Sequence, residues 1–183
     1  MSPTHVGAGL VVATAVATFE PAVGAAAAVG AVVGGALPDV DLFVGEHRKS
    51  LHFPVLGWVP ALVATAWALA APSALAWGVA VGLVAFALHA ASDVLGAGEE
   101  LRPWERTNPY AVYCHACGRW LRARYVVRYD GAPEDVVATG VLVVPAALVF
   151  EGPVWWAAVG LVAVGALYAV LRKRVVPYFE SMV

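Results

Sequence analysis

Apolar residues along the chain fall into six runs. They cover residues 6–19, 22–37, 54–71, 74–95, 136–150 and 154–171. The breaks between them hold proline, glycine or charge, as in Glu20-Pro21, Pro72-Ser73 and Glu151-Gly152-Pro153. Because proline begins helices well and continues them poorly, each break should end one helix and begin the next. The alternative of one helix from Val6 to Leu37 is disfavoured by Glu20-Pro21 at its middle.

The composition indicates that these helices lie in a membrane. Hydrophobic residues make up 61% of the 183 residues and charged residues only 13%, and the mean hydropathy is +0.77. So few polar groups cannot cover the surface of a soluble domain, and within a bilayer the backbone must be satisfied by helices. We therefore predict one membrane-embedded domain over residues 1–183, an all-α bundle of about six membrane-embedded helices. Several runs are shorter than the roughly 20 residues that cross a bilayer, which leaves open whether the first two cross fully.

The positive charges give the bundle an orientation. Six helices with both chain ends on one side place residues 1–5, 38–53, 96–135 and 172–183 together. All eleven lysine and arginine residues fall in these segments, whereas the opposite loops carry only Glu20 and Glu151. The positive-inside rule makes the first side cytoplasmic. We predict a multi-pass protein of the cell (inner) membrane with both termini, and the loop 96–135, in the cytoplasm.

The same side collects histidines and carboxylates from three parts of the chain. The candidate metal ligands are His5, Asp39, Asp41, His52, His89 and Asp93. His89 and Asp93 are four residues apart, on one helix face, in a run where ionisable groups are costly without a partner. A hydrogen bond closing the helix end is the simpler interpretation of that pair. Imidazole with carboxylate suits zinc, manganese or iron better than calcium, and zinc is the first expectation for a cytoplasm-facing metal site.

A metal at this place would make water a nucleophile, because it lowers the pKa of bound water towards about 7. A carboxylate that is not a tight ligand could then act as general base. The catalytic candidates are Asp39, Asp41 and His47. For His47 three roles stay open: metal ligand, proton shuttle or solvated neighbour of lipid headgroups.

Four short motifs resemble the YdjM-like family of inner-membrane, metal-dependent hydrolases. They are Thr4-His5, GALPDVD at Gly35–Asp41, His47-Arg48 with His52, and HAASD at His89–Asp93. The resemblance extends from residue 4 to about residue 104 and implies a hydrolase without naming its substrate. Lys49, Leu51 and Phe53 stand where the family has small and hydroxyl residues.

The order of the candidate ligands is also similar to that of zinc-dependent phospholipase C and its nuclease relatives. Those soluble helical enzymes cleave phosphodiesters with three zinc ions. Their later ligand cluster is missing here, because His115 is the only histidine after Asp93. The similarity therefore implies one or two metal ions in this chain.

The long loop 96–135 combines arginines with aromatic residues. Arg119, Arg122 and Arg124 are the candidates for binding substrate, since arginine beside aromatic rings suits anionic lipid headgroups or a phosphate. A short strand or helix lying over the bundle is the simpler interpretation. Cys114 and Cys117 are expected to be a reduced, buried, structural pair; half of a zinc site and a redox pair are the alternatives.

These observations predict a membrane-bound metal-dependent hydrolase that acts on a phosphoester or ester in or near the bilayer. Its expected partners are membrane lipids and a small-molecule or lipid substrate, and not nucleic acid, because no DNA-reading element is visible. The oligomeric state is left open. A small metal or ion transporter and a structural membrane protein are the alternatives. Reactive groups at one face favour surface chemistry over transport.

Overall fold

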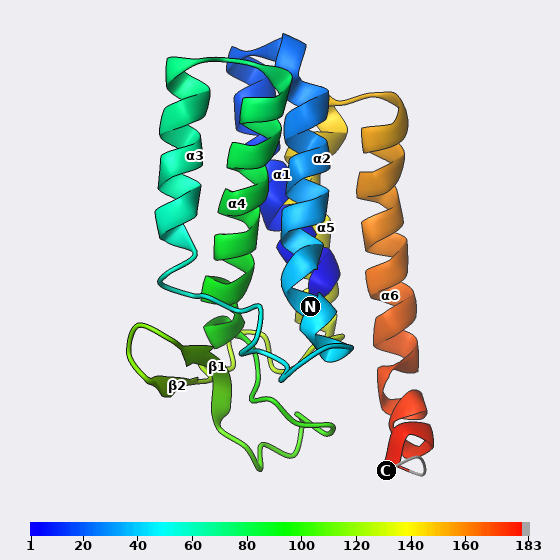
Figure 1. Ribbon diagram of the computed structural model, residues 1–183. Coiled ribbons are helices and arrows are strands. Elements are labelled where there is room, and N and C mark those ends of the chain that lie inside the picture. The colour runs from blue at the N-terminus through cyan, green and yellow to red at the C-terminus, as the bar shows by residue number, and fades with distance from the viewer. Residues whose placement is uncertain (181–183) are drawn as a thin grey trace.

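The computed structural model describes residues 1–180 and shows a bundle of helices in that part of the chain. The helices are α1 (Ser2–Phe19), α2 (Gly24–Ala36), α3 (Trp58–Ala70), α4 (Ala74–Ser92), α5 (Pro133–Val149) and α6 (Gly152–Glu180). Short 3-10 segments follow three of them: η1 (Pro21–Val23), η2 (Leu37–Leu42) and η3 (Asp93–Leu95). The helices stand side by side and alternate in direction (Figure 1). The predicted helical bundle is confirmed, with boundaries close to those of the six apolar runs.

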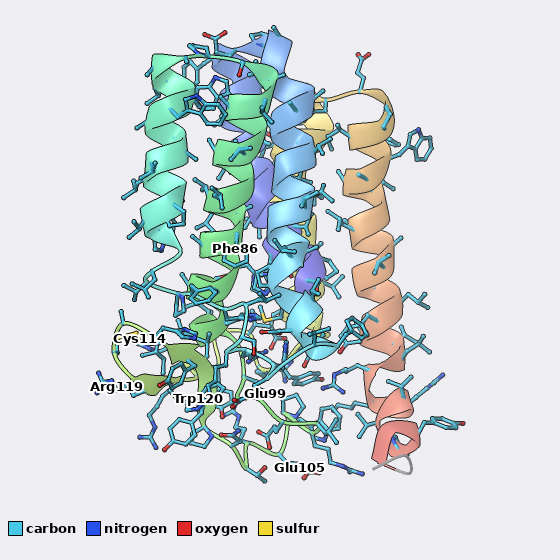
Figure 2. The ribbon with its side chains drawn as sticks, viewed as in Figure 1. Phe86, Glu99, Glu105, Cys114, Arg119 and Trp120 are labelled. Carbon is cyan, nitrogen blue, oxygen red and sulfur yellow. A yellow bond between two sulfur atoms is a disulfide. The ribbon has the colours of Figure 1, made fainter. Side chains whose placement is uncertain are left out.

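The two ends of the bundle differ in character. One end, here called the loop end, holds the start of α1, the end of α6 and the long connections after η2 and η3 (Figure 1). The other, the turn end, holds the short connections around Glu20, Pro72 and Glu151. Side chains with oxygen and nitrogen crowd the loop end, whereas the helices carry mainly apolar ones (Figure 2). The structure thus gathers the positively charged segments at one end, as the sequence predicts.

The first two apolar runs form a helical hairpin. Glu20 leaves the helical conformation with φ −133° and ψ 73°, and η1 begins at Pro21. The chain reverses there, and α2 returns along α1 (Figure 1). A single helix from Val6 to Leu37 is thereby excluded, and His5 lies at the same end of the bundle as η2.

Small residues fill the interior of the bundle. The buried core around Leu10 and Val81 consists mostly of alanines of α1, α2 and α5. A Cβ added at Gly34 would overlap the carbonyl oxygen of Gly82, so only glycine permits this approach of α2 to α4. Small residues at helix contacts are typical of membrane bundles, where backbones pack closely. The closeness of α2 and α4 brings η2 and the end of α4 together.

Large apolar side chains face outward instead. Leu62 and Leu69 of α3 and Trp156 and Leu167 of α6 are all at least 60% exposed. An apolar exterior of this extent is unsuited to water. Within residues 1–180, four helical segments are long and apolar enough to cross a membrane: Ser2–Phe19, Pro21–Leu42, Ala74–Leu95 and Gly152–Tyr178. The chain therefore has the build of a membrane protein, with α3 as a shorter apolar helix.

A buried polar cluster fixes the start of α1 against α5. The Thr4 hydroxyl lies 2.8 Å from the Thr139 hydroxyl and 3.2 Å from the Asp135 carbonyl oxygen. Its oxygen also bonds to the Asp135 carboxylate. Hydrogen bonds among buried polar groups are needed to offset their loss of water. The cluster holds the first turns of α1, and with them His5, in a fixed place.

The long loop contains a β-hairpin, which the all-α fold class did not include, although a short strand over the bundle was one interpretation of this loop. Strand β1 (Tyr110–Cys114) pairs antiparallel with β2 (Arg119–Arg122), and Cys114 lies opposite Arg119. The turn between them brings Cys114 and Cys117 to a Cα–Cα distance of 5.2 Å, and a disulfide joins them. Cys114 is buried but Cys117 is exposed. The structure thus shows the joined form of the pair, and the expectation that both cysteines are buried holds for Cys114 alone.

Candidate metal centre

Side chains from five segments converge at the loop end. His5 comes from the first turns of α1, Asp39 from η2, His52 from the loop before α3, His89 from the last turn of α4, and Asp93 from η3. The 3-10 segments set the direction of two of these side chains. The backbone winds more tightly after Pro38 and at the end of α4, which is where Asp39 and Asp93 project. Residues almost ninety positions apart thus share one small volume.

Asp93 lies at the middle of this group. Its Oδ1 atom is 3.2 Å from His5 Nε2, and its Oδ2 atom is 3.2 Å from His52 Nε2. The Nε2 atom of His89 is 3.9 Å from the same Oδ2. The His5 and His89 rings stack with centroids 3.9 Å apart. One carboxylate therefore faces three imidazoles.

Asp39 approaches the group from the other side. Its Oδ1 atom is 3.3 Å from His89 Nε2 and 4.0 Å from His52 Nε2. The Ser2 hydroxyl donates to its second oxygen, Oδ2. The Asp39 side chain is 20% exposed, whereas those of His52, His89 and Asp93 are at most 3% exposed. Asp39 is therefore the member that water reaches most readily.

Each of the three imidazoles is held through Nδ1. His89 Nδ1 donates to the Gly35 carbonyl oxygen at 2.7 Å, and His52 Nδ1 donates to Asp41 Oδ2 at 2.8 Å. His5 Nδ1 is 3.0 Å from the Ser92 hydroxyl, which itself donates to a backbone carbonyl oxygen. With Nδ1 as donor, the lone pair is on Nε2, which faces the shared centre. Fixing a ligating histidine through its second nitrogen is the usual arrangement around protein-bound metals.

Several atoms at the centre lack a hydrogen-bond partner. Among the residues that the structure describes, His52 Nε2, His89 Nε2 and Asp93 Oδ2 are buried without one. Leaving such atoms unpaired is costly. Two sets of ligand atoms lie close enough to share one ion: His5, His89 and Asp93, and Asp39, His52 and His89. The buried histidines and aspartates can therefore hold a metal ion.

Asp41 occupies a different place from the one predicted. Its Oδ1 atom is 2.8 Å from His47 Nδ1, and its Oδ2 atom accepts from His52 Nδ1 and from the Leu51 N–H. Both oxygens are thus engaged, and neither belongs to the two ligand sets. The structure places Asp41 behind His52, and His47 behind Asp41. They orient the centre from outside.

The surroundings of His52 favour positive charge. Burial alone would lower the pKa of its imidazole, but the Asp93 and Asp41 carboxylates outweigh that effect and raise it. Opposite charges within hydrogen-bond distance stabilise the charged form. The same carboxylates would favour a metal cation bound at His52 in place of the proton.

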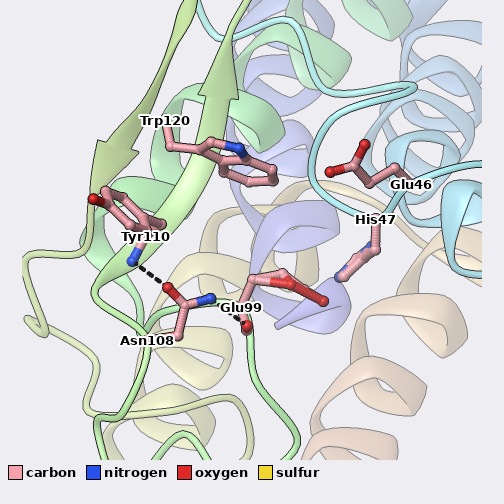
Figure 3. Close-up of a pocket in the computed structure, with 6 residues that line it drawn as sticks. All are labelled: Glu46, His47, Glu99, Asn108, Tyr110 and Trp120. Carbon is pink, nitrogen blue, oxygen red and sulfur yellow. Dashed lines mark hydrogen bonds between the residues drawn. The ribbon is translucent and has the colours of Figure 1, made fainter.

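A cleft of about 350 Å³ opens beside His47. It is lined by Glu46, His47, Glu99, Asn108, Tyr110 and Trp120 (Figure 3). The His47 ring and the Glu99 side chain point toward one another (Figure 3). The Asn108 amide donates to the Glu99 carbonyl oxygen at 2.8 Å and shapes the wall. Side-chain contacts link the cleft to the centre: His47 lines the cleft and bonds to Asp41, which bonds to His52.

The predicted substrate-binding arginines lie on and just after the hairpin. Arg119, Arg122 and Arg124 are exposed, and no contact found within residues 1–180 joins them to a residue of the centre. Arg48 is the basic residue beside it: Nη1 donates to the Ala97 carbonyl oxygen at 2.8 Å, and the guanidinium interacts electrostatically with Asp93.

Three contributors to the centre were not predicted as such: Arg48, Ser2 and Ser92. Arg48 appeared only beside His47 in the family-like motif, and the two serines carried no signal beyond their closeness to His5 and Asp93. Their roles depend on contacts between distant segments, such as that of Ser92 with His5.

No protein-family model, curated protein or solved structure matches the chain. Its function is therefore inferred from the side chains at the loop end. They define a candidate metal centre of three histidines and two aspartates, supported by Asp41 and Ser92, at one end of a helical bundle of membrane type.

Proposed function

We propose that this chain is a membrane-bound, metal-dependent hydrolase of phosphoesters or esters at the bilayer surface. The observation that carries the proposal is the convergence of unpaired, buried His52 Nε2, His89 Nε2 and Asp93 Oδ2 on one point. Such atoms are stabilised by a cation and by little else that fits among carboxylates.

The ligand sets favour a single ion. Both sets use His89, whose Nδ1 is already bonded to Gly35, so only the lone pair on Nε2 is free for a metal. One nitrogen lone pair binds one ion, and the two sets therefore describe one shared position. Three imidazoles with carboxylates suit zinc best, with manganese or iron as alternatives. When bound, this ion supplies Lewis acidity towards an ester or phosphoryl oxygen and lowers the pKa of water.

Asp39 is the residue that meets water and substrate. Its side chain is the most exposed of the five, and the Ser2 hydroxyl fixes one of its oxygens. With the ion held by the three histidines and Asp93, the other Asp39 oxygen, Oδ1, is not a ligand and can accept the proton of an attacking water. Asp41 keeps His52 oriented, and His47 keeps Asp41 oriented. The two predicted catalytic aspartates thus receive separate tasks.

The position of the centre suggests the kind of substrate. It lies at the end of the helices, where lipid headgroups would meet the loop end if the helices cross a bilayer. Because the lysines and arginines belong to that side, the positive-inside rule favours a loop end that faces the cytoplasm. Arg119, Arg122 and Arg124 would then face anionic headgroups from the hairpin. A lipid or isoprenoid phosphate is therefore a better candidate than a soluble metabolite.

The test is hydrolysis by zinc-loaded protein in mixed micelles of phospholipids, isoprenoid phosphates or generic phosphodiesters. Activity should vanish with a chelator, return with zinc, and fall about 10²–10⁴-fold in Asp39→Asn, as expected for loss of a general base. Glu105→Gln, an exposed carboxylate paired only with Arg102 among the contacts known, is the matched control and should keep full activity. His89-dependent movement of metal ions or protons across liposomes, without turnover, would establish the transporter instead.

A further inference from the structure

The disulfide at the tip of the β-hairpin lies at the end of the molecule where a stable disulfide is not expected. The chain has two cysteines, and they are joined to each other. The hairpin belongs to the loop end, which the positive charges assign to the cytoplasm. Disulfides persist in oxidising compartments, whereas those that form in the cytosol are mostly transient and either catalytic or redox-sensing. A pair that cycles between disulfide and dithiol agrees both with the disulfide in the structure and with the predicted cytoplasmic side.

The two cysteines differ in exposure, which gives an exchange reaction one accessible sulfur atom to attack. Cys114 is fully buried, and Cys117 is exposed. Gly118 beside it has φ +62°, and nothing lies within 4 Å of where its Cβ would be, so the tip is open. The Cys117 N–H lies 3.2 Å from Cys114 Sγ and is directed at it. A hydrogen bond to sulfur favours the thiolate, which makes Cys114 the better leaving group and Cys117 the point of attack.

His115 links the disulfide to the metal centre. The two joined cysteines bracket it, and its ring packs on Phe53 with centroids 4.6 Å apart. Its Nδ1 is buried and has no hydrogen-bond partner among the described residues, so ring packing and the closed turn keep it there. Phe53 directly follows His52. The Tyr113 N–H also donates to the Arg48 carbonyl oxygen at 2.9 Å.

We propose that Cys114–Cys117 is a thiol–disulfide exchange site whose state sets the packing of His115 on Phe53 and so the position of His52. The second half of this proposal rests on the proposed metal centre. The closed turn holds the His115 ring against Phe53, next to the candidate ligand His52. Opening the turn releases it, because no hydrogen bond of Nδ1 retains it.

The reaction needs a dithiol reductant. One of its thiolates attacks Cys117 Sγ; a mixed disulfide forms, the Cys114–Cys117 bond breaks, and Cys114 leaves as a thiolate that takes a proton. The second thiolate of the reductant then attacks its partner sulfur in the mixed disulfide and releases Cys117. Two electrons reach the protein, and the reductant departs as a disulfide.

Exchange is tested on the full chain in its own membranes. Cells are quenched in acid and labelled with a polymer-linked maleimide, which reports only this pair because the chain has no other cysteine. Untreated cells should show the dithiol, a thiol oxidant such as diamide should convert it to the disulfide, and a dithiol reductant should restore it. A pair that is fully oxidised in untreated cells, or that diamide leaves as thiols, overturns the proposal.

Single variants test the assigned direction of attack. In Cys114→Ser the remaining exposed Cys117 should react with maleimide about tenfold faster than the buried Cys114 does in Cys117→Ser, because access limits thiol reactivity. Equal rates would refute the assignment of Cys117 as the attacked sulfur.

The link to the centre is tested by zinc affinity. Purified disulfide and dithiol forms should differ about tenfold in zinc dissociation constant, the lower end of effects seen when outer partners of a ligand change. Phe53→Ala should keep exchange but lose this difference. Equal zinc affinities refute the link alone. Absence of zinc binding in both forms rejects the metal centre together with the link, while the labelling result for exchange stands independently.

Discussion

At the scale of single residues, the centre is defined by which nitrogen each histidine leaves free. His5, His52 and His89 all engage Nδ1 and turn Nε2 inward. Replacing His89 by alanine removes the nitrogen common to both ligand sets. We expect the unaltered protein to be purified with near-stoichiometric metal and His89→Ala to be purified without it. Metal content of detergent-purified samples measures this, with Glu105→Gln, an exposed residue outside the centre, as the control. Full metal retention in His89→Ala would disprove the ligand assignment.

Asp41 leads to a graded prediction. Because it orients His52 without lying in either ligand set, Asp41→Asn should weaken metal binding about 10- to 100-fold rather than abolish it. Competition with a chelator of known affinity gives the change. Total loss of metal would instead make Asp41 a direct ligand, as the sequence first suggested.

Sequence reasoning found the residues of the centre but could not rank them. His5, Asp39, His52, His89 and Asp93 were identifiable because ionisable groups are conspicuous in an apolar chain. The separation of Asp39 from Asp41 was not, since both follow Pro38 within one short segment. Which carboxylate faces inward depends on the 3-10 backbone of η2 and on the loop that brings His52 back to it.

At the scale of elements, the spacing of α2 and α4 is set by glycine. A methyl group at Gly34 would overlap the Gly82 carbonyl oxygen, whereas nothing lies within 4 Å of a Cβ at Gly160 in α6. Gly34→Ala should force the helices apart and cost about 1–3 kcal/mol or more, as overpacking does. Gly160→Ala is the control and should be neutral. Thermal stability in detergent, followed by size-exclusion chromatography, measures both; equal melting temperatures would contradict this packing.

The helices were predictable from the sequence, and the hairpin was not. Each helix follows an apolar run bounded by proline or charge, and α5 begins at Pro133 with Glu134 and Asp135 in its first turn, as the turn before it indicates. Strands β1 and β2 are only five and four residues long. Aromatic residues in β1 and arginines beside Trp120 in β2 fit a membrane surface as well as a strand, so pattern alone could not decide.

At the scale of the whole molecule, orientation in the membrane is the property to test. In a background of Cys114→Ser and Cys117→Ser, single cysteines are placed at Ala71 in the turn end and at Glu105 in the loop end; both positions are exposed. A maleimide that cannot cross membranes should label Ala71→Cys in intact cells and Glu105→Cys only after permeabilisation. The reverse pattern would place the metal centre outside the cell.

The hairpin of α1 and α2 has a consequence for how the protein is made. This helical hairpin brings His5 to the loop end. All five residues of the candidate centre lie between residues 5 and 93, ahead of α5 and α6 in the chain. At roughly 5–20 residues per second, the ribosome completes the ligand set several seconds before it finishes α6. We therefore expect zinc to be captured by the growing chain, and protein synthesised under chelation to reload slowly. Immediate, complete reloading of finished protein would show that the bundle remains open to metal after synthesis.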